Sequence, residues 1–338
     1  MLIGKNLCEL ACAVQTVVEN RNDFTAPSSE MWVKGNMFNI AGVDDFNIMP
    51  FFHEQLAATL DIPKAYYDRM REKDVPLWEN NVNTWLSKAT DDRLVRTVRG
   101  DARAFLSVKY RPFDNDMLLN TTLPILSEYP DMEVVSSEVT ERRMYLQVVF
   151  PGLQGEARKG DVIQSGLILS NSEVGFGAAS IFPLIYRPMQ QNGMIRDTAF
   201  AKDYIEGQMD MEYFFADSEI PDNNSFLLKI GDTIQEIFSK GTWDKTMKRL
   251  KMAAENKISE KSLVSIVEAV TNRYSMPVSS RDSILKNLAN GEDLSQWGLA
   301  NSISLLGSST DDYDKAIEYE SIGGKIIDLS AKEWKVLA

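Results

Sequence analysis

The chain has 338 residues, 44% of them apolar, and a formal net charge of -13. This length and apolar content support a sizeable folded core and exclude disorder of the whole chain. The acidic balance argues against a protein that coats duplex DNA by charge alone, but it leaves room for a local basic groove.

No run of about 18 consecutive apolar residues exists in the sequence, so we expect no membrane-spanning helix. Glu9 and Gln15 interrupt the first helical stretch, where a signal peptide would be apolar. We therefore expect a cytoplasmic protein that makes no contact with a membrane.

His53 is the only histidine, and Cys8 and Cys12 are the only cysteines. A single imidazole excludes zinc motifs with two histidines and most multi-histidine metal sites. Enzymatic chemistry would therefore depend on carboxylates, Lys, Tyr or Ser/Thr, or on a divalent ion held by oxygens. Two cysteines alone do not form a metal site, so we expect two buried thiols without a redox role, no bound metal and no cofactor.

Residues 1–90 are predicted to be mostly helical. Asn6 is placed to cap a helix that runs to about Val18, and the segment NMFNIAGV predicts one short strand. The segment FFHEQLAATLDIPKAYYDRMRE then has the periodicity of two helices joined near Ile62. This is also the spacing of a DNA-reading helix-turn-helix with basic residues on its second helix, although two small helices packed for structural reasons are commoner.

Residues 91–196 are predicted to form an antiparallel α+β core. Alternation over residues 93–99 and 103–109, around a turn at Gly100-Asp101, predicts a hairpin. Residues after Pro112 predict a helix capped by Asp114 or Asn115. Two further hairpins are expected from MEVVSSEVT with RRMYLQVVFP, and from DVIQSGLILSNS with GAASIFPLIYRP.

Residues 197–338 return to helical periodicity, with apolar residues at helical spacing in successive segments. The expected fold class is α+β: a central antiparallel β-rich core, made of a hairpin, a helix and further hairpins, flanked by N-terminal and C-terminal helical regions. We expect the three regions to pack as one compact unit. This order of elements differs from a βαβ nucleotide-binding fold.

The predicted first hairpin concentrates positive charge in an acidic chain. Residues of equal parity share a face of a strand, so at least one face would present several cations over a short span. Arginine forks bind phosphate oxygens at two points, and a neighbouring tyrosine can stack on a base. The alternative is a solvated hairpin paired with its own aspartates. The candidate phosphate-binding and nucleic-acid-binding residues are Arg93, Arg96, Arg99, Arg103, Lys109, Tyr110 and Arg111.

A second polar concentration follows an apolar strand at Asn171, Ser172 and Glu173, where Gly175 and Gly177 permit a tight turn. Small polar groups at a strand end can form the rim of a ligand site, but a glycine hairpin is the simpler alternative. No phosphate-binding GxxxxGK[ST] motif is present. The carboxylates that would hold a divalent ion, if the fold gathered them, are Asp114, Asp116, Glu138, Glu141 and Glu173.

Two long segments, RTVRGDARAFLSVKYRPFDN and SGLILSNSEVGFGAASIFPLIYRPMQQNGMI, resemble the phage and plasmid family known as domain of unknown function 932. LDIPKAYYDRM, NVNTWL and WGLANSISLLG are also similar to members, so the resemblance spans roughly residues 50 to 310. It implies a phage, prophage or plasmid origin, and hence the cytoplasm of a host cell. The family's activity is unassigned, and its shared polar positions raise the expectation of an enzyme. Carried onto this chain, those positions are Arg96, Arg103, Ser107, Tyr110, Arg111, Asn115, Ser170, Asn171, Ser172, Arg187 and Asn192.

The order hairpin, helix, antiparallel strands and closing helix is similar to the core of phage single-strand annealing proteins. Those proteins form oligomeric rings or filaments and hold the backbone of single-stranded DNA in a basic groove. No sequence motif carries this likeness, so it is an analogy of element order. It implies a homo-oligomer and single-stranded nucleic acid as the partner.

Three hypotheses follow, and the sequence leaves open whether the protein is an enzyme. The leading one is a mobile-element protein that binds nucleic acid, in single-strand annealing or another recombination or replication role. The first alternative is an enzyme acting on a nucleotide-like or phosphorylated substrate. The second is an inhibitor that binds a host protein. The polar pocket of the enzyme hypothesis would draw on Asn115, Asn171, Ser172, Glu173, Arg187 and Asn192.

Overall fold

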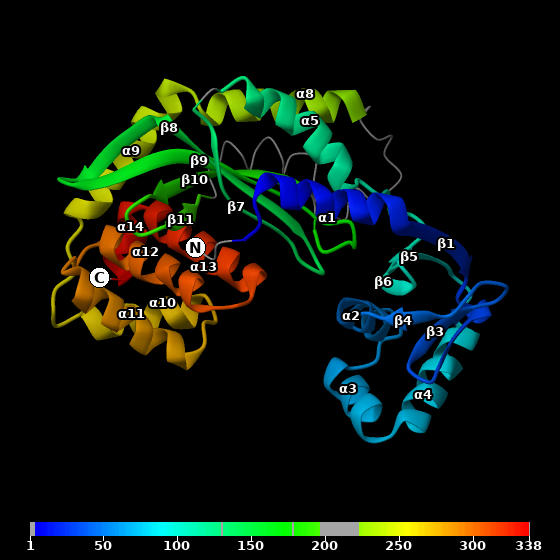
Figure 1. The fold of residues 1–338 in the computed structure, drawn as a ribbon. Helices are drawn as coiled ribbons and strands as arrows, with labels where there is room; N and C mark the ends of the chain where they lie inside the picture. The colour runs from blue at the N-terminus through cyan, green and yellow to red at the C-terminus, as the bar shows by residue number, and fades with distance from the viewer. Residues whose placement is uncertain (1–3, 130, 178, 197–222, 338) are drawn as a thin grey trace.

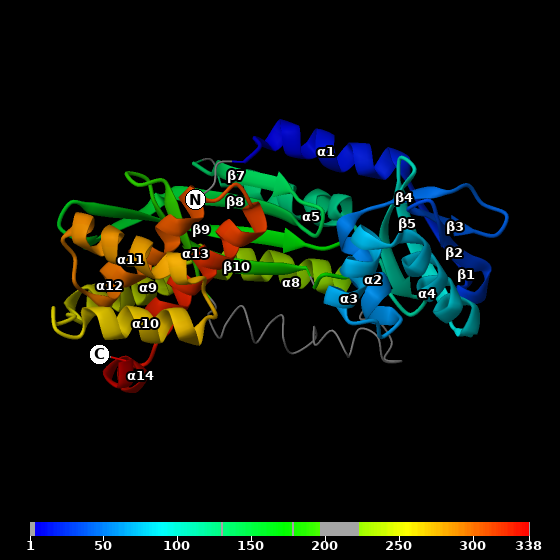
Figure 2. The ribbon, with the colours of Figure 1, turned by 90° about the horizontal axis from the view of Figure 1, so that it is seen from below.

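The computed structural model describes residues 4–129, 131–177, 179–196 and 223–337 (Figure 1). The predicted α+β class is confirmed: two curled sheets lie in the middle, one mixed and one antiparallel, with an N-terminal helix and a helical C-terminal region. The segment 197–222, which we predicted to be helical, lies outside the described residues. Figure 2 shows the six-stranded sheet and its helices at one end of the molecule, and the C-terminal helices at the other.

The six-stranded sheet has the order β1-β5-β6-β4-β3-β2, in which only the β4–β6 pair is parallel. Phe38, Phe52, Phe105 and Trp78 lie in the core that joins this sheet to three helices. The helices are α2 (Pro50–Thr59), α3 (Lys64–Lys73) and α4 (Val75–Lys88). The strands are β1 (Arg21–Pro27), β2 (Met31–Lys34), β3 (Met37–Ile40), β4 (Phe46–Ile48), β5 (Asp92–Val98) and β6 (Asp101–Ser107).

The prediction that residues 1–90 are mostly helical is confirmed by α1 to α4, but four strands lie among these helices where one was predicted. The helix after Asn6 is confirmed as α1 (Leu7–Asn20), and the predicted strand is β3. β1, β2 and β4 were missed because they are short or polar, and because β1 and β4 pair with strands far away in the sequence. β1 pairs with β5 over residues 21–27, so one sheet continues across the expected boundary at residue 90.

The first predicted hairpin is confirmed as β5 and β6, with its turn one residue earlier than expected. Arg99 and Gly100 occupy the turn with φ of 54° and 85°, as a two-residue hairpin of the mirror-image type I′ requires. β6 ends at Ser107. The strand therefore ends two residues before the end of the predicted range 103–109, and Lys109 and Arg111 lie beyond it.

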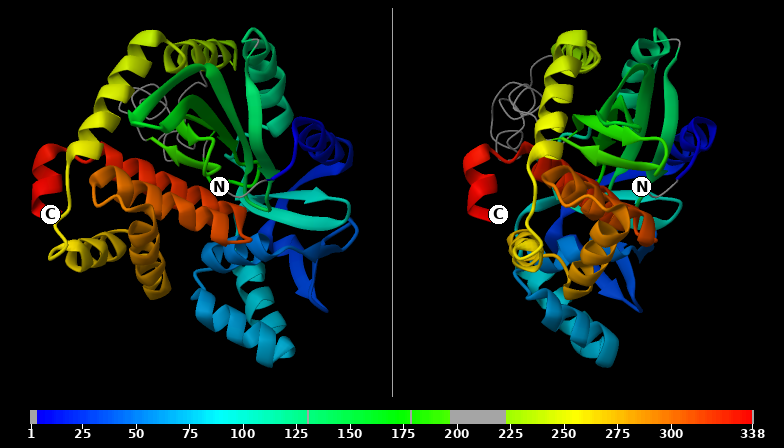
Figure 3. Two further views of the ribbon diagram at one scale, coloured as in Figure 1. Left: turned by 60° about the vertical axis from the view of Figure 1, so that its left-hand side comes forward. Right: turned by 90° about the vertical axis from the view of Figure 1, so that its left-hand side faces the viewer.

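The five-stranded sheet has the order β11-β10-β9-β8-β7 and is antiparallel throughout. Figure 3 shows helix α13 (Tyr313–Asp328) along one face of this sheet, with α5 (Asn115–Ser127) and α8 (Asn223–Ile237) on the other. Successive side chains of β8 point to opposite faces of the sheet: Leu146 packs toward α5, and Tyr145 packs toward α13. The strands are β7 (Glu133–Val139), β8 (Met144–Arg158), β9 (Asp161–Asn171), β10 (Ser180–Arg187) and β11 (Asn192–Ile195).

The C-terminal helices form the largest core cluster, around the fully buried Trp297. Besides α8 and α13 they are α9 (Lys240–Glu255), α10 (Leu263–Arg273), α11 (Val278–Gly291), α12 (Gln296–Ser304) and α14 (Ala331–Leu337). Within the described ranges, no helix combines the length and the apolar character needed to cross a membrane. The prediction of buried thiols is wrong: α1 buries Leu10 and Val14, and leaves both cysteines exposed.

Candidate functional site

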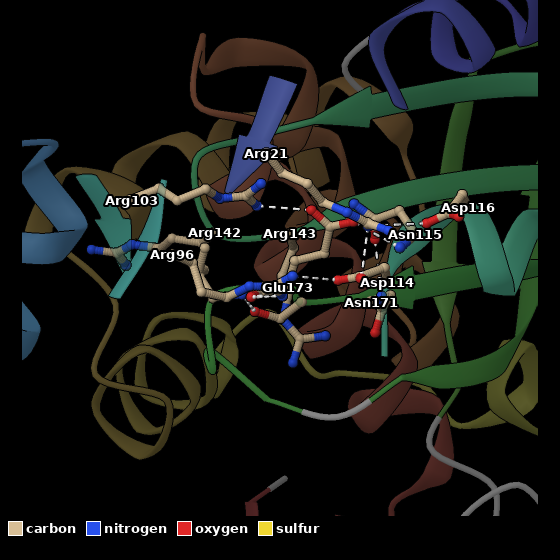
Figure 4. A network of polar contacts seen from close by, with 12 residues as sticks. Arg21, Arg96, Arg103, Asp114, Asn115, Asp116, Arg142, Arg143, Asn171 and Glu173 are labelled. Carbon is tan, nitrogen blue, oxygen red and sulfur yellow. Dashed lines mark hydrogen bonds and ion pairs between the residues drawn. The ribbon is translucent and has the colours of Figure 1, made fainter. Parts of the chain in front are cut away.

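A polar junction lies where the two sheets meet, between β5, the start of α5 and the segment after β9 (Figure 4). Arg96 stands at its centre and is only 3% exposed. Its guanidinium lies 3.0 Å from an Asp23 oxygen and 2.9 Å from an Asp114 oxygen, and it donates a 2.8 Å hydrogen bond to the carbonyl of Glu173. These bonds occupy the guanidinium and attach the first sheet to the second.

Glu173 is the acidic counterpart in the same junction and is 2% exposed. Its carboxylate lies 2.9 Å from Nη2 of Arg103 and accepts a 2.8 Å hydrogen bond from the backbone N–H of Asn115. The Asn171 amide donates to the side-chain oxygen of Asn115 at 2.9 Å and to the carbonyl of Phe113 at 2.8 Å. Four predicted pocket residues, Asn115, Asn171, Ser172 and Glu173, thus come together, but they bond to one another and to the backbone.

Tyr110 also belongs to this junction. Its ring packs with Phe51 and Val174, and its hydroxyl donates to the carbonyl of Ser172 at 3.2 Å. Burial raises the pKa of the hydroxyl to about 12. The ring is 9% exposed, so it does not offer a free face for stacking on a base.

The remaining predicted cations do not form one continuous face. Arg93 lies over the Phe105 ring and 3.6 Å from a carboxylate oxygen of Asp91. Arg99 is exposed at the hairpin turn, and Lys109 and Arg111 are exposed beyond the opposite end of β6. The length of β6 separates them by about 20 Å, given the usual rise per residue of a strand. Within the described residues these last three form no ion pair.

Arg187 and Asn192 lie away from the junction, so the six predicted pocket residues do not form one site. Arg187 forms an ion pair of 2.7 Å with Asp161 and packs over the Trp297 ring. Asn192 donates to the Ser304 hydroxyl at 2.6 Å. Of the predicted carboxylates, Asp114 and Glu173 lie in the junction, where each is paired with an arginine, and Asp116 shares Arg21 with Asp114. No group of three or more metal-ligating side chains occurs in the described part of the chain.

The structure brings together three residues that the sequence analysis did not select: Arg142, Arg143 and Phe176. The Phe176 ring is 40% exposed, and the two guanidinium carbons lie 4.9 Å and 5.7 Å from its centre. Arg142 also forms a 2.7 Å ion pair with Glu54, whereas Arg143 donates to the Phe176 carbonyl at 2.9 Å and to the Ser170 hydroxyl at 2.8 Å. Two features of the sequence could have pointed to these residues: the pair of adjacent arginines before β8, and the phenylalanine between two glycines.

Beside Arg143, a cavity of about 340 Å³ lies between the five-stranded sheet and α13. Its floor is formed by side chains of β8 to β11, including Tyr145, Ile168 and Phe182. Its wall is formed by α13 and by Tyr274 at the end of α10. This volume lies at the lower end of the range for small-molecule sites.

The charges around the cavity are not matched in pairs. Burial lowers the pKa of Arg143 by more than the nearby charges of Tyr145 and Asp314 raise it. Within the described residues no carboxylate lies at ion-pair distance from this guanidinium. Asp314 contributes to the same end of the cavity, but it accepts hydrogen bonds from Thr140 and from the Tyr145 hydroxyl. Burial raises the pKa of Tyr145, which keeps that hydroxyl a donor. The cavity therefore combines a guanidinium that has no carboxylate at ion-pair distance in the described residues with aromatic, hydroxyl and carboxylate groups.

Gly177, in the segment after β9, lies directly against the side chain of Arg143. We therefore expect Gly177→Ala to destabilise the fold. A Cβ there would lie 1.9 Å from Nη2 of Arg143, and φ of 121° disfavours any side chain. The matched control is Gly160→Ala, where φ is 80° but no atom lies within 4 Å. Urea unfolding should show a larger loss for Gly177→Ala, by about 1–3 kcal/mol. Equal losses would mean that the contact with Arg143 is unimportant.

Comparisons with known proteins give no relative for this chain. No family model matches it, and neither a curated protein nor a solved structure matches it. The resemblance to the phage and plasmid family therefore stays a hypothesis.

Proposed function

We propose that this protein binds single-stranded nucleic acid, with Phe176 and the guanidinium groups of Arg142 and Arg143 as the central contact. The observation that carries the proposal is the exposed Phe176 ring held beside two arginines. Stacking on an aromatic ring requires an unpaired base, and arginine forks suit the adjoining phosphates. The expected role is recombination or replication of a mobile element, since the family resemblance implies a phage, prophage or plasmid origin.

Lys109 and Arg111 support the same surface. They flank Tyr110, whose hydroxyl is bonded to the segment that carries Phe176, and both are exposed. They are the predicted phosphate-binding residues that stay accessible near this segment, whereas Arg96 and Arg103 are held in ion pairs with carboxylates. A net charge of -13 keeps non-specific attraction to duplex DNA low. We therefore expect a preference for single strands over duplexes.

We expect Phe176→Ala to weaken binding of a fluorescently labelled oligo-dT about tenfold, as loss of one stacked base does. Fluorescence anisotropy at 50 and 200 mM salt measures this, and affinity should also fall with salt by a log–log slope of about -0.7 per phosphate contact. Arg142→Gln should weaken binding less, because Glu54 already neutralises Arg142.

The matched control is Arg281→Gln, which removes an exposed arginine that is also paired with a carboxylate, Glu268. This variant should bind as the unchanged protein does. If no oligonucleotide binds at 50 mM salt, or if Phe176→Ala binds normally, the proposal is wrong.

The enzyme and host-protein hypotheses remain as alternatives. Asn171 and Glu173 are committed to bonds that join the two sheets, which argues against a catalytic role for them. Turnover of an added nucleotide would favour the enzyme. Purification with one host protein and no nucleic acid would favour the inhibitor.

A further inference from the structure

We infer that the cavity between the five-stranded sheet and α13 binds a single nucleotide, with its phosphate at Arg143 and its base against Phe182 and Tyr274. This site deepens the proposed function, on which it rests, because Arg143 belongs to both surfaces. The ligand is a nucleoside monophosphate, either free or as one unit of a strand.

The phosphate end is defined by the hydrogen bonds of Arg143. Its Nε and Nη2 donate to the carbonyl of Phe176 at 3.3 and 2.9 Å, and its Nη1 donates to the Ser170 hydroxyl at 2.8 Å. These contacts fix the plane of the guanidinium but supply no negative charge. Since a guanidinium carries five N–H donors, N–H groups on Nη1 and Nη2 are left for a ligand.

A charged guanidinium that has lost much of its water is costly unless a counter-ion pairs with it. Within the described residues no carboxylate lies at ion-pair distance from Arg143, and the charge of Asp314 at the same end of the cavity only partly offsets the effect of burial. A dianionic phosphate bound at Arg143 would pair with the guanidinium directly and replace the lost hydration. A neutral ligand would leave this cost in place. The electrostatics of this end of the cavity therefore select an anion.

The opposite part of the cavity selects an aromatic body. Phe182 lies on the floor of the cavity and Tyr274 on its wall. Ile168 of β9 and Ile195 of β11 add aliphatic surface to the floor. Aromatic and aliphatic side chains of this kind pack against the face of a base. Inorganic phosphate alone would leave this apolar surface in contact with water, so it should bind more weakly than a nucleotide.

Hydroxyl and carboxylate groups lie along the same walls, where a ribose or the edge of a base would pass. Ser180 and Ser321 contribute hydroxyls, and Asp314 contributes a carboxylate that Tyr145 orients. Lys325, 11 residues after Asp314 on α13, stands about 16 Å further along the helix, and Glu318 lies between them. The cavity is thus elongated, with its strongest anion site at the Arg143 end.

Isothermal titration of the full chain with AMP, CMP, GMP and UMP, each alone, tests this site against adenosine and inorganic phosphate. We expect at least one nucleotide to bind at least tenfold more tightly than either fragment. Arg143→Lys should weaken that binding about tenfold, because an ammonium cannot reproduce the planar fork.

Ser321→Phe fills the cavity from α13 without touching Arg143, and it should abolish nucleotide binding. Its matched control is Ser283→Phe, at an exposed serine on α11, which should bind normally. If circular dichroism shows that Ser321→Phe is unfolded, Tyr274→Ala replaces it in the test. Tyr274→Ala should weaken nucleotide binding at least threefold.

Two results would overturn the site: no nucleotide binds at millimolar concentration, or the cavity variants bind as the unchanged protein does. The failure of this site is distinguishable from that of the proposed function. Oligonucleotide binding that depends on Phe176, without mononucleotide binding, removes only the cavity site. Mononucleotide binding that Ser321→Phe abolishes, without any oligonucleotide binding, removes only the proposed function.

Discussion

Glu173→Ala should lower the free energy of unfolding by about 3–5 kcal/mol, the usual cost of leaving one member of a buried ion pair without its partner. Arg103 is mostly buried, with 13% of its side chain exposed, and Glu173 lies 2.9 Å from it. The substitution also removes the acceptor of the Asn115 backbone N–H. Urea unfolding at neutral pH measures the loss.

The double variant Arg103→Met with Glu173→Leu separates ion pairing from packing. Replacing both charges by apolar groups is often close to neutral, so the double variant should be more stable than Glu173→Ala. The control is Arg281→Ala, whose pair with Glu268 is exposed and screened by solvent, so this variant should lose little stability. A loss below 1 kcal/mol for Glu173→Ala would show that the junction does not hold the sheets together.

Acid should destabilise the N-terminal part of the protein through His53, which is 1% exposed. Burial, followed by the nearby charges of Arg71 and Lys64, lowers its pKa to about 3 from 6.5. The folded state therefore binds fewer protons than the unfolded state between pH 3 and 6.5. The stabilisation is complete above pH 6.5 and falls as the pH falls toward 3, by about 2 kcal/mol at pH 5.

His53→Phe should unfold with a flatter pH dependence than the unchanged protein between pH 7.5 and 5. The variant loses the 2.8 Å hydrogen bond between the imidazole and the Tyr67 hydroxyl, so it should be less stable at pH 7.5. The stability difference between the two proteins should shrink by about 2 kcal/mol at pH 5, because only the unchanged protein loses the contribution of His53. Carboxylates titrate in both proteins, so their effect cancels in this difference. Trp78, whose ring centre lies 5.8 Å from the imidazole, reports unfolding by fluorescence. Parallel pH curves for the two proteins would contradict the assignment.

The junction changes how the first hairpin's charge is understood. Arg96 and Arg103 have structural partners, and the Tyr110 hydroxyl is bonded to the backbone. Arg111 is exposed, so Arg111→Ala should affect oligonucleotide binding without a large loss of stability. Arg103→Ala should mainly affect stability, since it leaves the buried Glu173 carboxylate without its partner.

Local patterns account for the parts of the fold that were predicted correctly. Asn6 caps α1 and forms a reciprocal pair of hydrogen bonds with Glu9, and Asp114 stands at the N-cap position of α5. Alternating residues identified the strands of the five-stranded sheet, which pair with close neighbours in the chain. In contrast, β1 and β4 carry weak patterns and pair with strands more than 50 residues away in the sequence.

Local patterns also predicted only part of the candidate site. Asn115, Asn171 and Glu173 were selected from the sequence and do meet, whereas Arg142, Arg143 and Phe176 were not selected. The adjacent Arg142 is the local signal at Arg143, and it does not by itself indicate a site. The significance of Arg143 comes from the cavity beside it, from the lack of a carboxylate at ion-pair distance in the described residues, and from the segment after β9 that contacts it.

The sequence by itself determines the α+β class, most helices and all three predicted hairpins, because capping, turn chemistry and periodicity act between residues close in the chain. Only the tertiary structure decides which cations are free. Arg96 and Asp23 are separated by 73 residues, and their ion pair exists because two strands lie side by side. Charge can be counted in a sequence, but its accessibility depends on long-range packing, which buries Arg96 and Arg103 and leaves Arg143 beside a cavity.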